Sequence, residues 1–239
     1  MERAQTESYN NHKLATVFHD AGKKKVVIFC HGYRGTSIGP NRFFVRTART
    51  LTKLGISSVR FDQYCSGNSE GDFIDSSFND WIATTKLIAQ DYLKKGYQVT
   101  LLGQSMGGAV AIVVGSEISE IAGVVAWAPD PNIEPFHAPE SGIIEEVGQV
   151  VQVSFWQEAH DAQIAEKFPL IKAPTYVVQC TADEYVDKEN RNALSSRAKP
   201  HQKIEIFKGY SHSSWSYKQS EEIITRSVNF LVQSFKNAQ

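Results

Sequence analysis

Residues 99–114, VTLLGQSMGGAVAIVV, set one serine between two apolar runs. The first run is short and typical of a buried strand, and the second is typical of a buried helix. Gly103 and Gly107 each lie two residues from Ser105. In a sharp strand-to-helix turn, side chains at these two places would collide as strand and helix converge, so both places favour glycine. The pattern therefore predicts a strained turn that exposes Ser105 as a candidate nucleophile.

A serine hydroxyl needs a base that takes its proton and an acid that orients the base. Of the seven histidines, only His212 comes just after the last predicted strand, residues 203–207. Asp183 follows the strand before it, and Asp130 follows an earlier strand. Both aspartates remain candidates for the acid, and we favour Asp183 because its loop lies nearest the final strand.

Acyl transfer also requires donors for the negative charge that develops on the carbonyl oxygen. The backbone N–H of Met106 is one candidate, because this residue opens the predicted helix. The second is the N–H of Tyr33, in the loop after the first parallel strand, where Gly32 permits close approach of the backbone. We expect His31 to hold this loop in place rather than to take part in chemistry.

Short β-rich runs alternate with helical periods along the chain, which predicts an α/β fold with a mostly parallel sheet. Residues 14–18 are expected to form an antiparallel edge strand. Apolar residues at helical spacing predict helices after Pro40, after Ser77 and at the C-terminus. The parallel strands are predicted at residues 24–30, 57–61, 99–102, 123–128, 175–179 and 203–207.

Residues 129–172 separate two predicted strands by more than one crossover helix requires, so we expect a cap or lid insertion within a single domain that spans residues 1–239. Val150, Val151, Val153 and Phe155 are expected to be extended, and residues 158–168 helical. Apolar side chains of this insertion could line a substrate pocket or pack the cap against the core. The candidates for pocket contacts are Phe136, Phe155 and Trp156.

The composition is that of an ordinary globular protein, with 41% hydrophobic and 21% charged residues in a chain of 239. Twenty-five Lys and Arg against 26 Asp and Glu give a net charge of −1, which argues against nucleic acid as the main partner. The sequence contains neither an apolar signal segment nor a run long enough to span a membrane, so we expect a cytoplasmic location. Cys30, Cys65 and Cys180 show no metal or disulfide spacing and are expected to be buried thiols.

From Lys24 to Phe235 the chain resembles the α/β-hydrolases. The landmarks are His31-Gly32, Phe61-Asp62 running into Gly67-Asn68-Ser69-Glu70-Gly71, Gly103-Gln104-Ser105-Met106-Gly107, and Asp183 followed by His212. Within that superfamily the segment around Phe61 is similar to bacterial cinnamoyl or feruloyl esterases. The chain departs from those relatives at Cys65, Ser66 and Cys180, where they usually carry Gly, His and Gly. Its insertion is also shorter than we expect for a feruloyl esterase.

The resemblance implies that Ser105 is the nucleophile, Asp183 the acid and His212 the base, with the amides of Tyr33 and Met106 as the oxyanion hole. It implies hydrolysis of a small-molecule carboxylic ester through an acyl-enzyme, with no metal or organic cofactor. Two alternatives stay open on the same scaffold: cleavage of a thioester or an amide, and a non-catalytic binding member of the superfamily. The assembly is expected to be a monomer or a homodimer.

Overall fold

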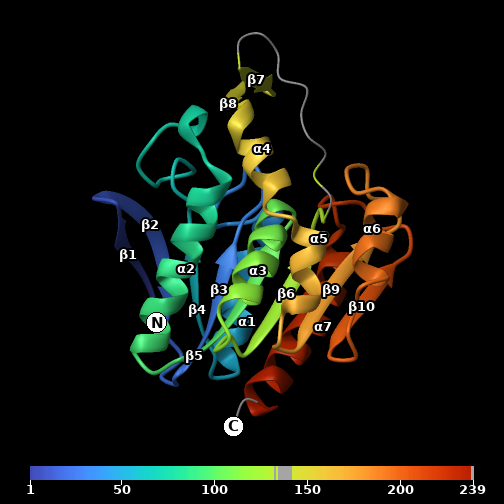
Figure 1. Ribbon diagram of the computed structural model, residues 1–239. Coiled ribbons are helices and arrows are strands. Elements are labelled where there is room, and N and C mark those ends of the chain that lie inside the picture. Colours follow the sequence, from blue (N-terminus) through green and yellow to red (C-terminus); the bar gives the residue numbers. More distant parts are fainter. Residues whose placement is uncertain (132, 134–141, 238–239) are drawn as a thin grey trace.

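The computed structural model describes residues 1–131, 133 and 142–237. Its centre is an eight-stranded sheet in the spatial order β1-β2-β4-β3-β5-β6-β9-β10 (Figure 1). The six strands β4, β3, β5, β6, β9 and β10 run parallel to one another. Strand β2 is antiparallel to both of its neighbours, β1 and β4. The mostly parallel α/β fold predicted from the sequence is therefore confirmed. The strands are β1 (Glu2–Tyr9), β2 (His12–His19), β3 (Lys25–Cys30), β4 (Ser57–Phe61), β5 (Gln98–Gln104), β6 (Gly123–Trp127), β9 (Thr175–Cys180) and β10 (Gln202–Phe207).

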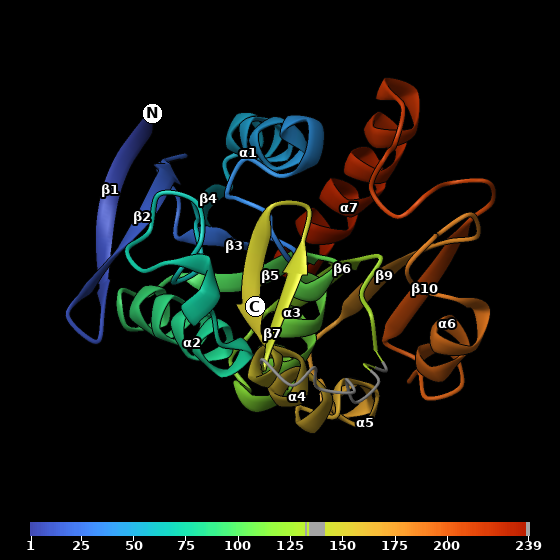
Figure 2. The same cartoon turned by 90° about the horizontal axis from the view of Figure 1, so that it is seen from above.

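Helices cover both faces of this sheet (Figure 2). The helices α1 (Phe43–Lys53) and α7 (Tyr217–Asn237) lie on one face, and α2 (Phe78–Lys94) and α3 (Met106–Glu117) lie on the other. Residues of the central strands alternate between the two cores, as Ile28 and Phe29 do. Burial on both faces explains why these strands are continuous apolar runs in the sequence. The remaining helices are α4 (Val153–Asp161), α5 (Ile164–Lys167), α6 (Lys188–Ser195) and three short 3-10 turns, η1 (Pro40–Arg42), η2 (Phe73–Asp75) and η3 (Phe168–Leu170).

The N-terminal residues form a strand that the sequence did not predict. Residues 14–18 lie within β2, but β2 pairs with β1 on one side and with β4 on the other, so the expectation of an edge strand there is wrong. The edge is β1, and most of its side chains are exposed. Backbone hydrogen bonds to β2 hold it in place, and such bonds leave no apolar pattern in the sequence.

The inserted segment between β6 and β9 also differs from expectation. Its described part contains the hairpin β7 (Ile143–Glu146) and β8 (Gln149–Gln152), followed by α4 and α5. Val153 and Phe155 were expected to be extended and are helical. Val151 and Phe155, four residues apart, are both completely buried. Val151 lies in β8, whereas Phe155 lies in α4 and packs its ring against Trp81 of α2, and this packing outweighs the local preference of Val153 for a strand.

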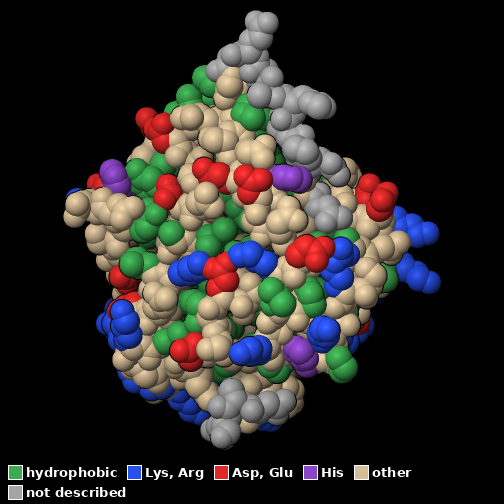
Figure 3. Space-filling view, in the orientation of Figure 1, with side chains coloured by type: hydrophobic (Ala, Val, Ile, Leu, Met, Phe, Trp, Pro, Cys, Tyr) green, Lys and Arg blue, Asp and Glu red, His purple; other side chains and the backbone are tan. Residues whose placement is uncertain are grey.

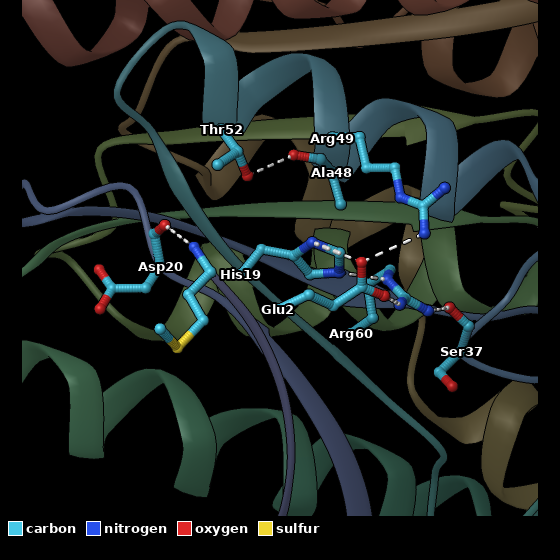
Figure 4. Close-up of polar contacts among 9 residues, drawn as sticks. Glu2, His19, Asp20, Ser37, Ala48, Arg49, Thr52 and Arg60 are labelled. Atoms are coloured by element: carbon cyan, nitrogen blue, oxygen red, sulfur yellow. Dashed lines mark hydrogen bonds and ion pairs between the residues drawn. The ribbon is translucent and has the colours of Figure 1, made fainter.

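A charged group is buried beneath the N-terminal strand (Figure 4). The Arg60 Nε donates a hydrogen bond of 3.0 Å to Nε2 of His19, and Glu2 lies within 3.9 Å of both side chains. Burial and the neighbouring positive charge of Arg60 lower the pKa of His19 from 6.5 to about 4. The His19 ring is therefore neutral at pH 7 and accepts the hydrogen bond from Arg60.

This lowered pKa predicts an acid-sensitive stability. The unfolded chain takes up a proton at His19 below pH 6.5, whereas the folded protein does so only near pH 4. The free energy of unfolding should therefore fall as the pH drops from 6.5 to 4, by up to about 3 kcal/mol from this residue. Denaturant melts between pH 4 and 7.5 measure the slope. His19→Gln keeps an acceptor for Arg60 but cannot titrate, so its curve should be flatter; curves that run parallel would refute the assignment.

The surface of the helical layer carries both signs of charge. In Figure 3 the Lys and Arg side chains alternate with Asp and Glu across the visible face. Glu117, for example, forms ion pairs with both Lys86 and Lys167. Cys30, Cys65 and Cys180 are free and buried, as expected. Across the described residues, no helix combines the length and the apolar character needed to cross a membrane.

Candidate active site

Ser105 stands at the turn between β5 and α3. Its φ of 55° and ψ of −125° are a conformation that side-chain-bearing residues rarely adopt. The strand and helix converge so tightly that a Cβ on Gly103 would lie 2.0 Å from the carbonyl oxygen of Gly107. A Cβ on Gly107 would lie 2.1 Å from the carbonyl oxygen of Cys30. Both glycines are thus required by close approach of backbones, as the sequence pattern predicted.

The three side chains proposed for chemistry lie in one hydrogen-bonded row. Nε2 of His212 is 2.8 Å from Oγ of Ser105, and Nδ1 of His212 is 2.9 Å from Oδ2 of Asp183. They come from loops after β5, β9 and β10, which end at the same edge of the sheet. This arrangement can move a proton from the hydroxyl to an imidazole that a carboxylate orients.

Asp183 is set to accept hydrogen bonds from two directions. Its Oδ1 accepts from the amides of Tyr185, at 2.9 Å, and Val186, at 2.8 Å. Burial by itself would raise the pKa of the Asp183 carboxyl, but the hydrogen bond and charge of His212 and these two amides together lower it below its usual range. The carboxylate is therefore ionised at neutral pH. Asp130, the alternative acid, lines the pocket.

Glu184 has a role that the sequence did not reveal. Glu184 does not cap the following helix α6, which begins after Asp187, whose side chain accepts the Asn190 amide. The Oε2 of Glu184 instead accepts the backbone N–H of His212 at 3.1 Å. Two adjacent acidic residues after β9 thus hold the side chain and the backbone of His212. The only signal in the sequence was the position of Glu184 next to Asp183.

The two proposed oxyanion donors belong to segments that meet at Ser105. Met106 is the first residue of α3, so its N–H has no carbonyl partner one turn earlier in the helix. Tyr33 follows Gly32, where an added Cβ would lie 3.0 Å from Cβ of Ser105. His31 holds this loop, as expected: the Gln63 amide donates to its Nε2, and its Nδ1 is 2.9 Å from the Gly32 carbonyl.

A pocket of about 540 Å³ opens beside Ser105 and His212. Its walls include Tyr33, Trp156 and Tyr185, with Tyr185 67% exposed. Arg34 and Glu146 also line it and lie 3.5 Å apart as an ion pair, joining the loop after β3 to the β7–β8 hairpin. No pattern in the sequence predicts this ion pair, because its partners are more than a hundred residues apart.

Of the three residues of the insertion that were predicted to contact substrate, the structure places only Trp156 in the wall of the pocket among the described residues. Trp156 lines the pocket, with its ring 4.9 Å from that of Tyr33. Phe155 is 0% exposed and does not line the pocket; its ring packs between Tyr33 and Trp81. The prediction that Phe155 contacts substrate is therefore wrong, because the helical turn at this residue points its side chain into the core. Phe136 lies outside the described residues.

The site has no arrangement typical of a metal centre in the ranges that the structure describes. Within them, no group of three or more His, Cys, Asp or Glu side chains is placed to hold a metal ion. The groups gathered around Ser105 are instead those of nucleophilic catalysis: a hydroxyl, an imidazole, a carboxylate and backbone amides.

A family model described as serine aminopeptidase, S33, matches residues 21–152, which is more than half of the chain. The chain belongs to this family. The segment matched to the S33 family includes the Ser105 turn and ends at the last residue of β8, so Asp183 and His212 lie beyond it. Among curated protein sequences, none gives a significant match.

Several solved structures share this fold over almost the whole length of the chain. Est1E from Butyrivibrio proteoclasticus, solved with bound ferulic acid, has a TM-score of 0.85 at 21% identity, over 98% of this chain and all of its own. A putative hydrolase from Agrobacterium vitis S4 has 0.82 at 18%, over 97% and 98% of the two chains. A monoacylglycerol lipase from Paleococcus ferrophilus has 0.77 at 20%, over 92% and 99%. The predicted α/β-hydrolase fold and the resemblance to that superfamily are confirmed.

Proposed function

We propose that this protein is a serine hydrolase that cleaves carboxylic esters of small to medium acyl groups through an acyl-enzyme. The observation that carries the proposal is the continuous hydrogen-bonded row from Asp183 through His212 to Ser105, with distances of 2.9 and 2.8 Å. Each contact is within the range needed for proton transfer between a nucleophile and its base.

The proposed reaction has two halves. His212 takes the proton of Ser105 as the hydroxyl oxygen attacks the acyl carbon, and the amides of Tyr33 and Met106 donate to the oxyanion. His212 then gives its proton to the leaving alcohol, which departs and leaves an ester on Ser105. In the second half, His212 removes a proton from water, which attacks this ester, and the Ser105 oxygen regains a proton as the acid is released. Asp183 holds the tautomer of His212 throughout.

The pocket supports a substrate with an apolar acyl or alcohol group. A volume of about 540 Å³ suits a small to medium ligand, and the rings of Tyr33 and Trp156 offer an apolar wall. We propose that residues 129–172 act as a cap over this pocket, since Glu146 and Trp156 of that segment line it. We also expect the protein to act in the cytoplasm, as a monomer or a homodimer.

A substrate panel with active-site labelling tests the proposal. The panel contains p-nitrophenyl esters from acetate to dodecanoate, methyl ferulate, an acyl-CoA and an aminoacyl p-nitroanilide. We expect a short or medium ester to give a kcat/KM at least about tenfold above the thioester and the anilide, and a fluorophosphonate probe to label one serine. Faster thioester or amide cleavage would replace the ester assignment, and a protein that is neither labelled nor active on any member would be a non-catalytic binding protein.

A further inference from the structure

The loop that carries Tyr33 is held by the carboxyl end of the neighbouring strand β4. Ser37, four residues after Tyr33, has both of its backbone groups bound to buried charged side chains. Its N–H donates to Oδ1 of Asp62 at 2.6 Å, and its carbonyl accepts from Nη1 of Arg60 at 2.8 Å. Arg60 is 4% exposed and Asp62 1% exposed. Ser37 is thus fixed by two ionised groups, which form stronger hydrogen bonds than neutral ones.

The same strand end also holds the start of this loop, because the amide of Gln63 donates to His31. Between the two anchors, Arg34 has a φ of 56°, a conformation that costs a residue with a side chain about 1 kcal/mol or more. A short loop with such a residue keeps its shape only where its surroundings hold it. Contacts of residues 60–63 therefore set the position of the intervening Gly32-Tyr33-Arg34 segment beside Ser105.

Arg60 makes three different contacts with its guanidinium (Figure 4). Nη1 binds Ser37, Nε binds His19 at 3.0 Å, and Nη2 lies 3.4 Å from Oε1 of Glu2. A buried cation is costly unless it is paired, and Glu2 is the carboxylate that the N-terminal strand supplies. Arg49 of α1 approaches the other oxygen of Glu2, at 3.3 Å, and forms no hydrogen bond or ion pair with the described residues of the active-site loop.

We propose that Arg60, held in place by Glu2, is a positioning residue for the oxyanion hole. Through this contact, the N-terminal strand β1 helps to hold the active-site loop. The inference rests on the proposed function. Arg60 touches neither substrate nor the reacting atoms. It acts through Ser37, whose carbonyl it binds, on the placement of the Tyr33 amide.

The consequence for catalysis is specific to the transition state. A displacement of the Tyr33 amide weakens its hydrogen bond to the oxyanion, which exists only while the reaction proceeds. The ground-state ester makes little use of that donor, so KM should change far less than kcat. General destabilisation of the fold, by contrast, would lower the concentration of active enzyme without changing the turnover number of the folded fraction.

The test compares Arg60→Gln with Arg49→Gln, which removes the other arginine near Glu2. Active sites are counted with a fluorophosphonate, and kcat and KM are then measured on the best ester of the panel. We expect Arg60→Gln to lower kcat per active site about 10- to 100-fold, with KM within about threefold of the wild type. The affinity for phenylboronic acid, which forms a tetrahedral adduct on serine, should fall in parallel. Arg49→Gln should stay within about threefold on all three measurements.

Two further variants keep the test decisive where Arg60→Gln does not fold. Arg60→Lys retains the charge but cannot bind Ser37, His19 and Glu2 together. Glu2→Gln keeps the arginine but removes the carboxylate that holds its guanidinium. Both should lower kcat and weaken boronate binding, and wild-type values in a folded Arg60→Lys or Arg60→Gln protein would overturn the proposal.

Hydrogen exchange separates this inference from the proposed function. The amides of residues 32–37 should exchange faster in the Arg60 variants than in Arg49→Gln, whatever reaction the protein catalyses. If these amides exchange faster in the Arg60 variants but the wild-type protein cleaves no ester, the proposed esterase function is wrong and the positioning role of Arg60 stands. If exchange and kcat are both unchanged in the Arg60 variants, the positioning role of Arg60 is wrong and the proposed esterase function stands.

Discussion

Replacing Ser105 with alanine should lower kcat for the preferred ester by about 10⁴- to 10⁶-fold. The hydroxyl oxygen, 2.8 Å from Nε2 of His212, is the only protein atom in the proposed cycle that forms a covalent bond to the acyl group. Without it, the oxyanion donors and His212 can at most assist the direct attack of water. Steady-state kinetics on a p-nitrophenyl ester measure the loss, and labelling by a fluorophosphonate should disappear with it.

The fold should survive this change, since only one hydrogen bond of the Ser105 side chain is removed. We expect the free energy of unfolding to change by no more than about 1 to 2 kcal/mol. Ser116→Ala is the matched control, because Ser116 lies in the same helix and its hydroxyl bonds to the Val113 carbonyl, far along α3. It should keep full activity and labelling. If Ser105→Ala still turned over the ester and still reacted with the probe, the nucleophile would be another residue.

The sequence predicted the features that depend on burial and on local chain geometry. Strands such as β3, covered on both faces, are apolar runs whose limits can be read directly. The turn at Ser105 was predictable because close approach excludes every side chain from Gly103 and Gly107. Asp183 and His212 could be selected because parallel strands end at one edge, so residues far apart in the chain meet there.

What the sequence did not predict depends on contacts between distant segments. The strand β1 carries mostly exposed residues, and its place is set by backbone bonds that any sequence can form. Phe155 follows two valines in a pattern that suits a strand, but packing against Trp81 makes that turn helical. Glu184 is likewise defined only by its contact with the His212 amide. None of these leaves a periodic or compositional trace.

Replacing Gly107 with alanine should have the largest effect on stability. The new Cβ would lie 2.1 Å from the carbonyl oxygen of Cys30 and 2.4 Å from that of His31, and neither backbone group can turn aside as a flexible side chain could. To make room, α3 must move away from the end of β3. Extra methyl groups in a packed core usually cost about 1 to 3 kcal/mol, and this contact with rigid backbone should cost at least the upper figure. Urea or guanidinium denaturation measures it.

Gly108→Ala is the control that separates this clash from a general effect of alanine at the start of α3. There the added Cβ would meet Pro129 at 3.1 Å, which a shift of a few tenths of an ångström relieves, and alanine favours a helix by about 1 kcal/mol over glycine. Its stability should stay within about 1 kcal/mol of the wild type. Any folded Gly107→Ala should also be less active, because separating β3 from α3 parts the amides of Tyr33 and Met106. Equal stability of the two variants would mean that strand and helix are not locked together at Gly107, and the strained turn at Ser105 would then lack its physical cause.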